Sequence, residues 1–234
     1  MPPKPRPHGK KPPPRLKSSR KPTAGVDRRM LLIAGIGGAV AVAAVVGVLV
    51  LGGGGGDTDA RAALEAAGCT LSATPALAPG DHSVTTPDGT SEKWTTDPPT
   101  SGPHYGLTVI WGVYDEPVNQ GQLVHNLEHG GIFIQYGDDV PPATIEALKT
   151  FASGKPRGTV LAPYAKLGDK IALGVWVTES EQFSEGEVTG SADGTALLAK
   201  CTTFDESAFA AFFDAYQFKG PERLPADMLL PGRQ

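Results

Sequence analysis

Residues 131–178 have the sequence GIFIQYGDDVPPATIEALKTFASGKPRGTVLAPYAKLGDKIALGVWVT, in which strand-like and helix-like segments alternate. Pro142 at a first helical turn and Gly154 beyond a last one predict a helix over residues 142–152. Short runs of β-branched and aromatic residues predict strands around that helix, at residues 131–136, 159–161 and 171–178. Because helix and strands are intermingled, this stretch predicts an α+β domain with a small, mainly antiparallel sheet and flanking helices.

Similar signals extend outward from this stretch in both directions. Helices are expected at residues 57–68, which begin with acidic residues and end in glycine, and at residues 206–216. A further strand is expected at residues 107–114. Residues 72–103 are rich in Pro, Thr, Ser, Gly and Asp, and are expected to be mostly loop with at most a short strand. The globular domain is therefore expected to cover residues 58–234.

An apolar segment precedes this domain. Residues 30–51, MLLIAGIGGAVAVAAVVGVLVL, carry no charged or strongly polar side chain. At a rise of about 1.5 Å per residue, a helix of this length is about 30 Å long and matches the hydrocarbon core of a bilayer. We therefore expect one transmembrane helix here. The alternative is a cleaved signal peptide, whose apolar region is normally shorter, about 7–15 residues.

Charge is distributed unevenly about the apolar segment. Residues 1–29 contain ten Lys and Arg residues and one acidic residue, a net charge of +9. Of the 21 basic and 25 acidic residues of the chain, the other eleven and twenty-four lie in residues 57–234, a net charge of −13. The positive-inside rule then places residues 1–29 in the cytoplasm and the C-terminal domain outside a cell membrane that the chain crosses once.

The tail and the tether on either side of the apolar segment have simple compositions. Residues 1–29 are a mixture of Pro, Lys and Arg with little to bury, so they are expected to be disordered. Beside a bilayer, such a basic tail contacts anionic lipid headgroups. It carries no nucleic-acid-binding motif, and we expect no nucleic-acid partner. Residues 52–57 contain five consecutive glycines and predict a flexible tether to the domain.

The chain has two cysteines, Cys69 and Cys201, and both lie on the predicted outer side of the membrane. In an oxidising compartment, an even pair of cysteines is more often a disulfide than two free thiols. We therefore expect a disulfide that ties the first helix of the domain to the region before its last helix.

Histidine is scarce and unevenly placed. Four of the five histidines lie within residues 82–129, and they are His82, His104, His125 and His129. His125 and His129, in HNLEH, are four residues apart, which on a helix places both imidazoles on one face, where they can share a metal ion. Two ligands do not make a tight site, so a third is required. His104, in the turn-like sequence TSGPHYG, is the leading candidate for it.

Further residues are expected to complete the metal shell. Met228 is the only methionine beyond residue 30, and a thioether beside imidazoles favours copper, especially Cu(I), over zinc. Met228 or His82 would complete the shell, and Glu128 would orient one of the histidines. In the alternative interpretation, the histidines only satisfy backbone carbonyls and Met228 packs in the core.

HNLEH also matches the H-x-x-E-H pattern of inverted zinc peptidases, in which Glu128 would act as the general base. That pattern belongs in a longer helix with an acidic third ligand further along the chain. Here Gly130 and Gly131 follow His129 directly, so the match is formal.

Three blocks of sequence resemble a known family: PPTSGPHY (98–105), WGVYDEPV (111–118) and LVHNLEHGGIFIQY (123–136). Together they resemble the bacterial domain-of-unknown-function family 3105, over roughly residues 58–230. The resemblance implies a single N-terminal membrane segment followed by an outer domain, and it implies no established activity. The family pattern includes histidines at positions 104, 125 and 129 together with Glu128, which implies that these residues share a site.

The leading hypothesis is a membrane-anchored extracytoplasmic domain that binds a transition metal, copper in preference to zinc, for metal handling or sensing. One alternative is a zinc-dependent hydrolase that uses Glu128 as its base and keeps one coordination position open. Another is a non-catalytic scaffold of the cell envelope that contacts a membrane or envelope protein through its acidic face.

Overall fold

The computed structural model describes residues 55–77, 79–178, 183–184, 187–188, 194–222 and 224–233. The predicted transmembrane helix at residues 30–51, the basic tail and residues 52–54 of the predicted tether lie outside these ranges. Within the described ranges, no helix is both long enough and apolar enough to cross a membrane. The first described helix, α1 (Gly55–Ala66), begins inside the expected tether and ends just before Gly68, whose φ of 75° suits glycine.

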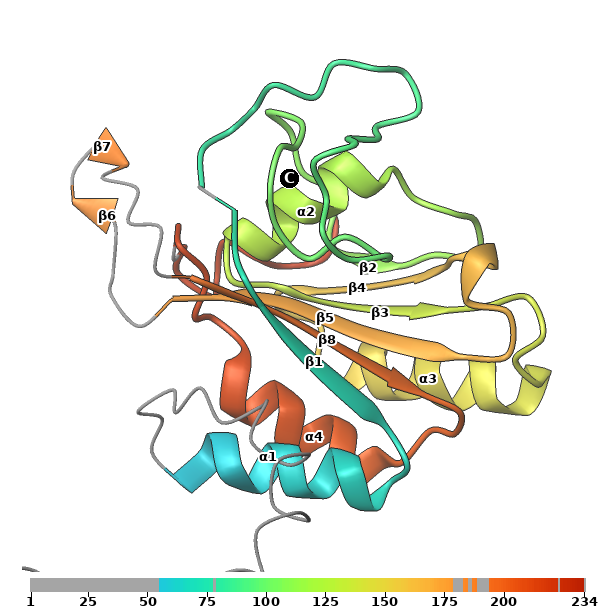
Figure 1. Cartoon of the computed structure of the whole chain (residues 1–234). Helices are drawn as coiled ribbons and strands as arrows, with labels where there is room; N and C mark the ends of the chain where they lie inside the picture. The colour runs from blue at the N-terminus through green and yellow to red at the C-terminus, as the bar shows by residue number, and fades with distance from the viewer. Residues whose placement is uncertain are drawn as a thin grey trace, which may run out of the picture. The chain divides into compact units, whose positions relative to one another are not determined.

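A six-stranded mixed sheet forms the centre of the domain (Figure 1). Neighbouring strands are antiparallel among the first four in the spatial order, and the last three strands are parallel to one another. The spatial order is β1 (Thr70–Pro75), β8 (Thr195–Cys201), β5 (Ile171–Val177), β3 (Ile132–Tyr136), β4 (Thr159–Pro163) and β2 (Gly112–Val113). A separate pair of two-residue strands is formed by β6 (Phe183–Ser184) and β7 (Glu187–Val188). The predicted α+β class with a mainly antiparallel sheet is confirmed.

Helices cover the two faces of the sheet unequally. Figure 1 shows α1, α3 (Pro142–Gly154) and α4 (Glu206–Tyr216) on one face and α2 (Gln120–Glu128) on the other. Successive side chains of a strand point to opposite faces, so Ile132 and Ile134 of β3 pack in the core under the three helices. Phe133, between them, packs in the second core under α2. The central strands β3, β4 and β5 are buried on both faces. Among the described residues, α2 is the one α-helix on its side of the sheet, and the short 3-10 helix Ala165–Leu167 contributes Leu167 to the same core.

Three strands differ from their sequence predictions. β8 was not predicted, because its sequence TALLAKC consists mostly of Ala, Leu and Lys in place of β-branched or aromatic residues. The strand expected at residues 107–114 is reduced to β2, because the side-chain amide of Asn126 donates to the carbonyl of Val109 (2.8 Å) and accepts from its N–H (2.8 Å). The N–H and carbonyl of Val109 are therefore bonded to a side chain in place of the backbone of a neighbouring strand. β1 falls partly in the expected loop because its residues are mostly exposed at the sheet edge, without the apolar alternation that predicts a strand.

Cys69 and Cys201 form a disulfide, as expected from the sequence. The reason is the register between the two neighbouring strands, in which Thr70 pairs with Lys200. Each cysteine is next to one of these partners, at the point where α1 leads into β1 and where β8 ends. Closing a loop this long stabilises the fold by roughly 5 kcal/mol in the chain-entropy model. The disulfide lies in the core under α1, α3 and α4, on the face of the sheet away from α2.

Candidate metal centre

Helix α2 carries most of the HNLEH motif. The side chain of Asn119 caps its first turn by accepting from the N–H of Gln122 (3.0 Å). The helix ends at Glu128, and the N–H of His129 still donates to the carbonyl of His125 (3.2 Å). His125 and Glu128 are therefore three residues apart on one helix, on the same side of it. The sequence left open whether this segment is helical, and the structure shows that it is.

Two glycines end α2 abruptly. Gly130 has a φ of 87°, a conformation that other residues rarely adopt. A Cβ atom on Gly131 would lie 2.4 Å from the ring of Trp111, so only glycine fits there without displacing the indole. β3 then starts at Ile132. The turn therefore holds the C-terminal end of α2, with its glutamate and histidine, directly over the start of the central strand.

The loop before β2 brings a second histidine to the helix. The N–H of His104 donates to the carbonyl of Asp81 (2.9 Å), and its own carbonyl accepts from the N–H of Val84 (3.2 Å). The next residue, Tyr105, donates its N–H to the carbonyl of Gly121 in α2 (3.3 Å). These bonds connect residues 81–84, residues 104–105 and α2, although the three segments are far apart in sequence.

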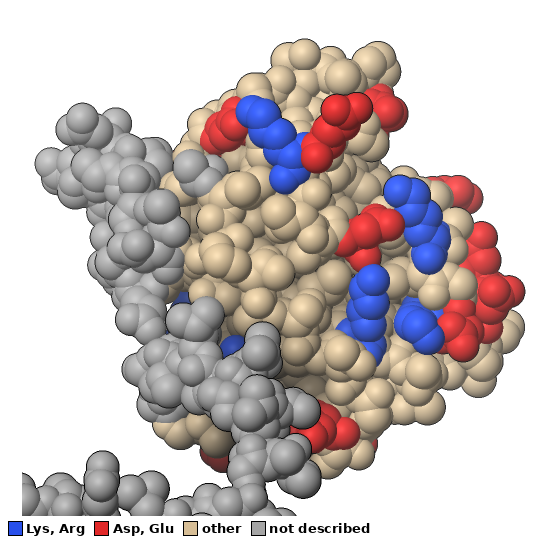
Figure 2. All heavy atoms as spheres, viewed as in Figure 1, with Lys and Arg blue, Asp and Glu red and all other residues tan. Residues whose placement is uncertain are grey.

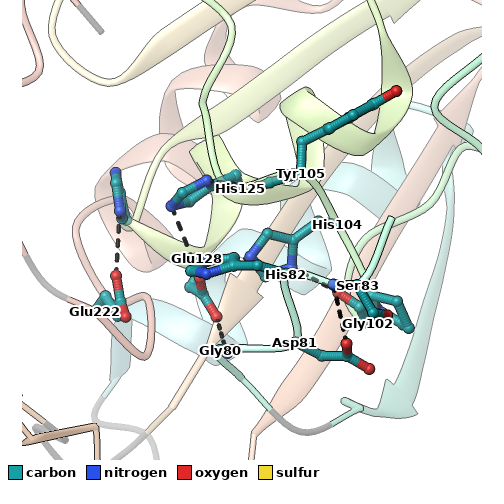
Figure 3. Close-up of polar contacts among 12 residues, drawn as sticks. Gly80, Asp81, His82, Ser83, Gly102, His104, Tyr105, His125, Glu128 and Glu222 are labelled. Atoms are coloured by element: carbon teal, nitrogen blue, oxygen red, sulfur yellow. Dashed lines mark hydrogen bonds and ion pairs between the residues drawn. The ribbon is translucent and has the colours of Figure 1, made fainter. Parts of the chain in front are cut away.

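The carboxylate of Glu128 lies at the centre of the histidines (Figure 3). Its Oε2 atom is 2.9 Å from Nε2 of His104, 3.7 Å from Nε2 of His82 and 3.9 Å from Nε2 of His125. Its Oε1 atom accepts the backbone N–H of Gly80 (2.6 Å). The side chains of Glu128 and His104 are fully buried, whereas that of His82 is 43% exposed. One potential ligand atom from each of these four residues lies within 4.8 Å of the other three.

Backbone carbonyls determine which ring nitrogens are free. Nδ1 of His104 lies 2.7 Å from the carbonyl oxygen of Gly102, and Nδ1 of His125 lies 2.8 Å from that of Tyr105. A carbonyl only accepts hydrogen bonds, so both Nδ1 atoms carry a proton. In the neutral rings, the Nε2 lone pairs are then the available ligands, and both lie on the side of Glu128. This fixing of a ligand ring through its other nitrogen is typical of metal-binding histidines.

The contact between His104 and Glu128 is short but poorly directed. Nε2 of His104 and Oε2 of Glu128 are buried and 2.9 Å apart, yet among the described residues neither has a partner in good hydrogen-bond geometry. Buried polar atoms almost always have such a partner. A cation bound between the nitrogen and the oxygen would be coordinated by both.

The protonation of the cluster follows from burial and mutual contacts. Burial lowers the pKa of His125 to about 4, helped by the neighbouring rings of His129 and His104, so its imidazole is neutral. Burial alone would lower the pKa of His104, but the nearby Glu128 and the carbonyl of Gly102 raise it above the ordinary value. Burial alone would raise the pKa of Glu128, but His104 and the Gly80 N–H hold it below the ordinary value. Without a metal, His104 and Glu128 therefore form a buried ion pair.

A second group of potential ligands adjoins the first. Nε2 of His129 lies 3.2 Å from Oε2 of Glu222, and these side chains are 16% and 14% exposed. The backbone N–H of Glu222 donates to the carbonyl of Glu128 (2.9 Å), which connects the C-terminal segment to the end of α2. His125, His129 and Glu222 form a group whose potential ligand atoms also lie within 4.8 Å of one another. His125 belongs to both groups.

Comparison with known protein families bears on the identity of the chain. The model of a family described as "Protein of unknown function (DUF3105)" matches residues 86–227. The chain belongs to the DUF3105 family. The predicted family resemblance is thus confirmed, and the match includes every residue of the two ligand groups except His82. No curated protein and no solved structure matches the chain.

The predicted ligands of this DUF3105 domain are partly brought together. His82, His104 and His125 meet at one carboxylate, and His129 lies beside His125 with its ring centre 4.4 Å away, facing Glu222. The sequence therefore identified all four histidines, but it did not show that they divide into two groups.

Two acidic residues differ from what we expected from the sequence. Glu128 is at the centre of the first group as a potential direct ligand, whereas we expected it only to orient a histidine. Glu222 was not identified, because it is distant from the HNLEH motif in sequence and belongs to no local pattern. Met228 is 50% exposed, and its assignment as a ligand stays a prediction.

Proposed function

We propose that this DUF3105 domain binds one divalent transition-metal ion through His104, His125, Glu128 and His82. The observation that supports it best is the convergence of three Nε2 atoms on one buried carboxylate oxygen, at 2.9, 3.7 and 3.9 Å. The role that fits a non-catalytic donor set of this kind is metal handling or sensing.

An ion pair alone does not account for this arrangement. One protonated histidine is enough to neutralise Glu128, and His104 already does so. The rings of His82 and His125 nevertheless pack 4.9 Å from each other, and those of His104 and His125 also lie 4.9 Å apart. His125 is held neutral with its Nε2 lone pair toward the carboxylate. Bound together to one cation, the three imidazoles and the carboxylate would form an ordinary metal site, which explains why they converge.

The donor set also indicates which ions to expect. Three imidazole nitrogens and one carboxylate oxygen suit zinc and other borderline divalent ions. The preference for copper rested on the Met228 thioether, and that side chain is 50% exposed. We therefore propose Zn²⁺ as the primary candidate in place of Cu(I). Cu²⁺ is expected to compete in vitro, because imidazole sites generally bind it more tightly than Zn²⁺.

The test uses the full-length chain, purified in detergent because residues 30–51 are strongly apolar. Metal content is measured by mass spectrometry, and the metal-free chain is titrated with Zn²⁺ in the presence of a competing chelator. We expect one tightly bound ion per chain, with affinity reduced at least about tenfold in His104→Ala and unchanged in His8→Ala, whose histidine lies in the basic tail. Wild-type protein that binds no metal, or a His104→Ala variant that binds as tightly, would refute the proposal.

A zinc-dependent hydrolase is the second candidate, and one observation favours it. Glu222 supplies the acidic third residue that the H-x-x-E-H pattern requires beside His125 and His129. Against it, Glu128 is fully buried, and its Oε1 atom is occupied by the Gly80 N–H. A base must reach the water that it activates. Turnover of peptide or ester substrates by the zinc-loaded chain, abolished in Glu128→Gln with zinc retained, would establish hydrolysis in place of binding.

We further propose that residues 30–51 anchor the domain in a membrane with residues 1–29 in the cytoplasm, as the charge asymmetry predicts. Labelling intact cells with a membrane-impermeant reagent tests this, with a single cysteine introduced in turn into each flank of a chain lacking Cys69 and Cys201. The scaffold hypothesis has less support. Figure 2 shows acidic and basic side chains interspersed on the visible face, whereas a partner selected by charge would favour a face of one sign.

A further inference from the structure

The two ligand groups meet at one residue. His82, His104, His125 and Glu128 form one group, which we call the inner position. His125, His129 and Glu222 form the other, which we call the outer position. Figure 3 shows the His125 ring above the carboxylate of Glu128, with Glu222 set apart from that carboxylate.

His125 has only one nitrogen to offer. Its Nδ1 atom carries the proton that it donates to the Tyr105 carbonyl (2.8 Å), so Nε2 provides the one available lone pair. A single lone pair binds a single ion. His125 therefore cannot serve both positions at the same time while its bond to Tyr105 is kept, and a bridge through both nitrogens would require breaking that bond.

We propose that one metal ion has two alternative positions in this domain, inner and outer, and that His125 is a ligand in whichever of the two is occupied. This inference rests on the proposed metal binding. The outer position is the exchange position, where the ion is received from or passed to another metal-binding molecule.

In each group the carboxylate keeps an imidazole neighbour when the ion is at the other position. Nε2 of His104 lies 2.9 Å from Oε2 of Glu128, and Nε2 of His129 lies 3.2 Å from Oε2 of Glu222. Neither carboxylate is therefore left without a polar neighbour, and an isolated buried carboxylate is what would make such a movement costly.

The two positions differ in the way that exchange requires. The inner position offers four ligands, of which His104 and Glu128 are fully buried and His82 is 43% exposed. The outer position offers three, and the two that are specific to it are partly exposed. Zinc sites with three protein ligands keep a coordination position open for a further molecule, whereas sites with four are closed. The inner position is therefore suited to retention and the outer one to transfer.

Co²⁺ tests this in the full-length chain, because its visible absorption reports its ligands. We expect one Co²⁺ per wild-type chain. His104→Ala should still bind one Co²⁺, at least about tenfold more weakly and with a changed spectrum, because only the outer position remains. Glu222→Gln should keep the wild-type spectrum and an affinity within about threefold, but release Co²⁺ to a chelator several times more slowly. His8→Ala and Glu146→Gln, an exposed carboxylate on α3, serve as controls.

Three results would overturn the two-position proposal while leaving metal binding intact. They are two Co²⁺ ions bound to one wild-type chain, no Co²⁺ bound to a folded His104→Ala chain, and unchanged release from Glu222→Gln. Circular dichroism establishes that each variant is folded. A wild-type chain that binds no Co²⁺ and no Zn²⁺ would instead remove the proposed function, and this inference with it.

Discussion

Nε2 of His104 lies 2.9 Å from Oε2 of Glu128, and both side chains are fully buried. The two residues come from different segments, one from the loop before β2 and the other from the last turn of α2. Their charges compensate each other in the metal-free chain, and a bound ion would lie where these two atoms and two further imidazoles converge. Most of the testable consequences of the structure follow from this pair.

Glu128→Gln keeps the shape of the side chain and removes its charge. We expect the affinity for Zn²⁺ to fall at least about tenfold, which is about 1.4 kcal/mol. The metal-free chain should also lose about 1–3 kcal/mol of unfolding free energy, because the buried partner of His104 and Gly80 is weakened. Zinc titration and urea unfolding measure the two effects. The exposed Glu146→Gln should change neither, and equal zinc affinity in both variants would contradict the assignment of Glu128 as a ligand.

Stability of the metal-free chain should depend on pH through His125, whose pKa burial lowers from 6.5 to about 4. The unfolded chain takes up this proton at higher pH than the folded chain, so acid favours unfolding. The unfolding free energy should therefore decrease as pH falls from 6.5 toward 4, by about 3 kcal/mol from this residue. Urea unfolding at several pH values measures it. In His125→Gln the dependence should flatten, and an equally steep one would show that another group is responsible.

Metal binding should release a proton near neutral pH. Burial alone would lower the pKa of His104, but Glu128 raises it above the ordinary value, so the metal-free ring holds a proton that an ion must displace. Zinc affinity should therefore fall as pH decreases below the pKa of His104. Calorimetry in buffers with different ionisation enthalpies counts the protons released. A count of zero at neutral pH would mean that the ion displaces no proton from His104, and therefore that His104 is not a ligand.

Replacing both cysteines should lower the stability of the fold without changing the affinity of the metal site. The double variant Cys69→Ala and Cys201→Ala should lose about 2–5 kcal/mol of unfolding free energy, because the unfolded chain is no longer constrained. Zinc affinity of the folded variant should remain within about twofold of wild type, because the disulfide packs on the face of the sheet away from α2. A large loss of affinity in a folded variant would show that the two faces are coupled.

Asn126 is expected to position the loop that connects His104 to β2. Its side chain makes two hydrogen bonds to the backbone of Val109, both at 2.8 Å. Asn126→Ala leaves these buried groups unpaired and should cost about 1–3 kcal/mol of stability. Trp111, which is 2% exposed, should become more accessible, and tryptophan fluorescence with acrylamide quenching measures this. Unchanged quenching would mean that the loop is held by other contacts.

Much of the architecture follows from local signals. The helix expected at residues 206–216 is α4 with the same bounds, because Asp205 caps it by accepting from the Ala208 N–H and its apolar residues face the core. Strands expected from β-branched runs appear as β3, β4 and β5, which are buried on both faces. The edge strand β1 lies mostly in a segment that we expected to be loop with at most a short strand, because it has no buried alternating face to produce a pattern. The buried strand β8 was not identified, because its Ala and Leu residues do not indicate a strand.

The arrangement of the site, in contrast, could be predicted only in part from local sequence patterns. Scarcity and spacing were enough to identify the histidines as a group with a shared chemistry, since side-chain type and an i, i+4 interval are properties of the sequence. The position of Glu128 at their centre, and the pairing of Glu222 with His129, depend on how the loop before β2 and the segment after α4 pack against the end of α2. These contacts join residues distant in sequence, and backbone hydrogen bonds that no side-chain pattern records hold them in place. The chemistry of the residues was therefore predictable, whereas their division into two groups sharing His125 was decided by tertiary packing alone.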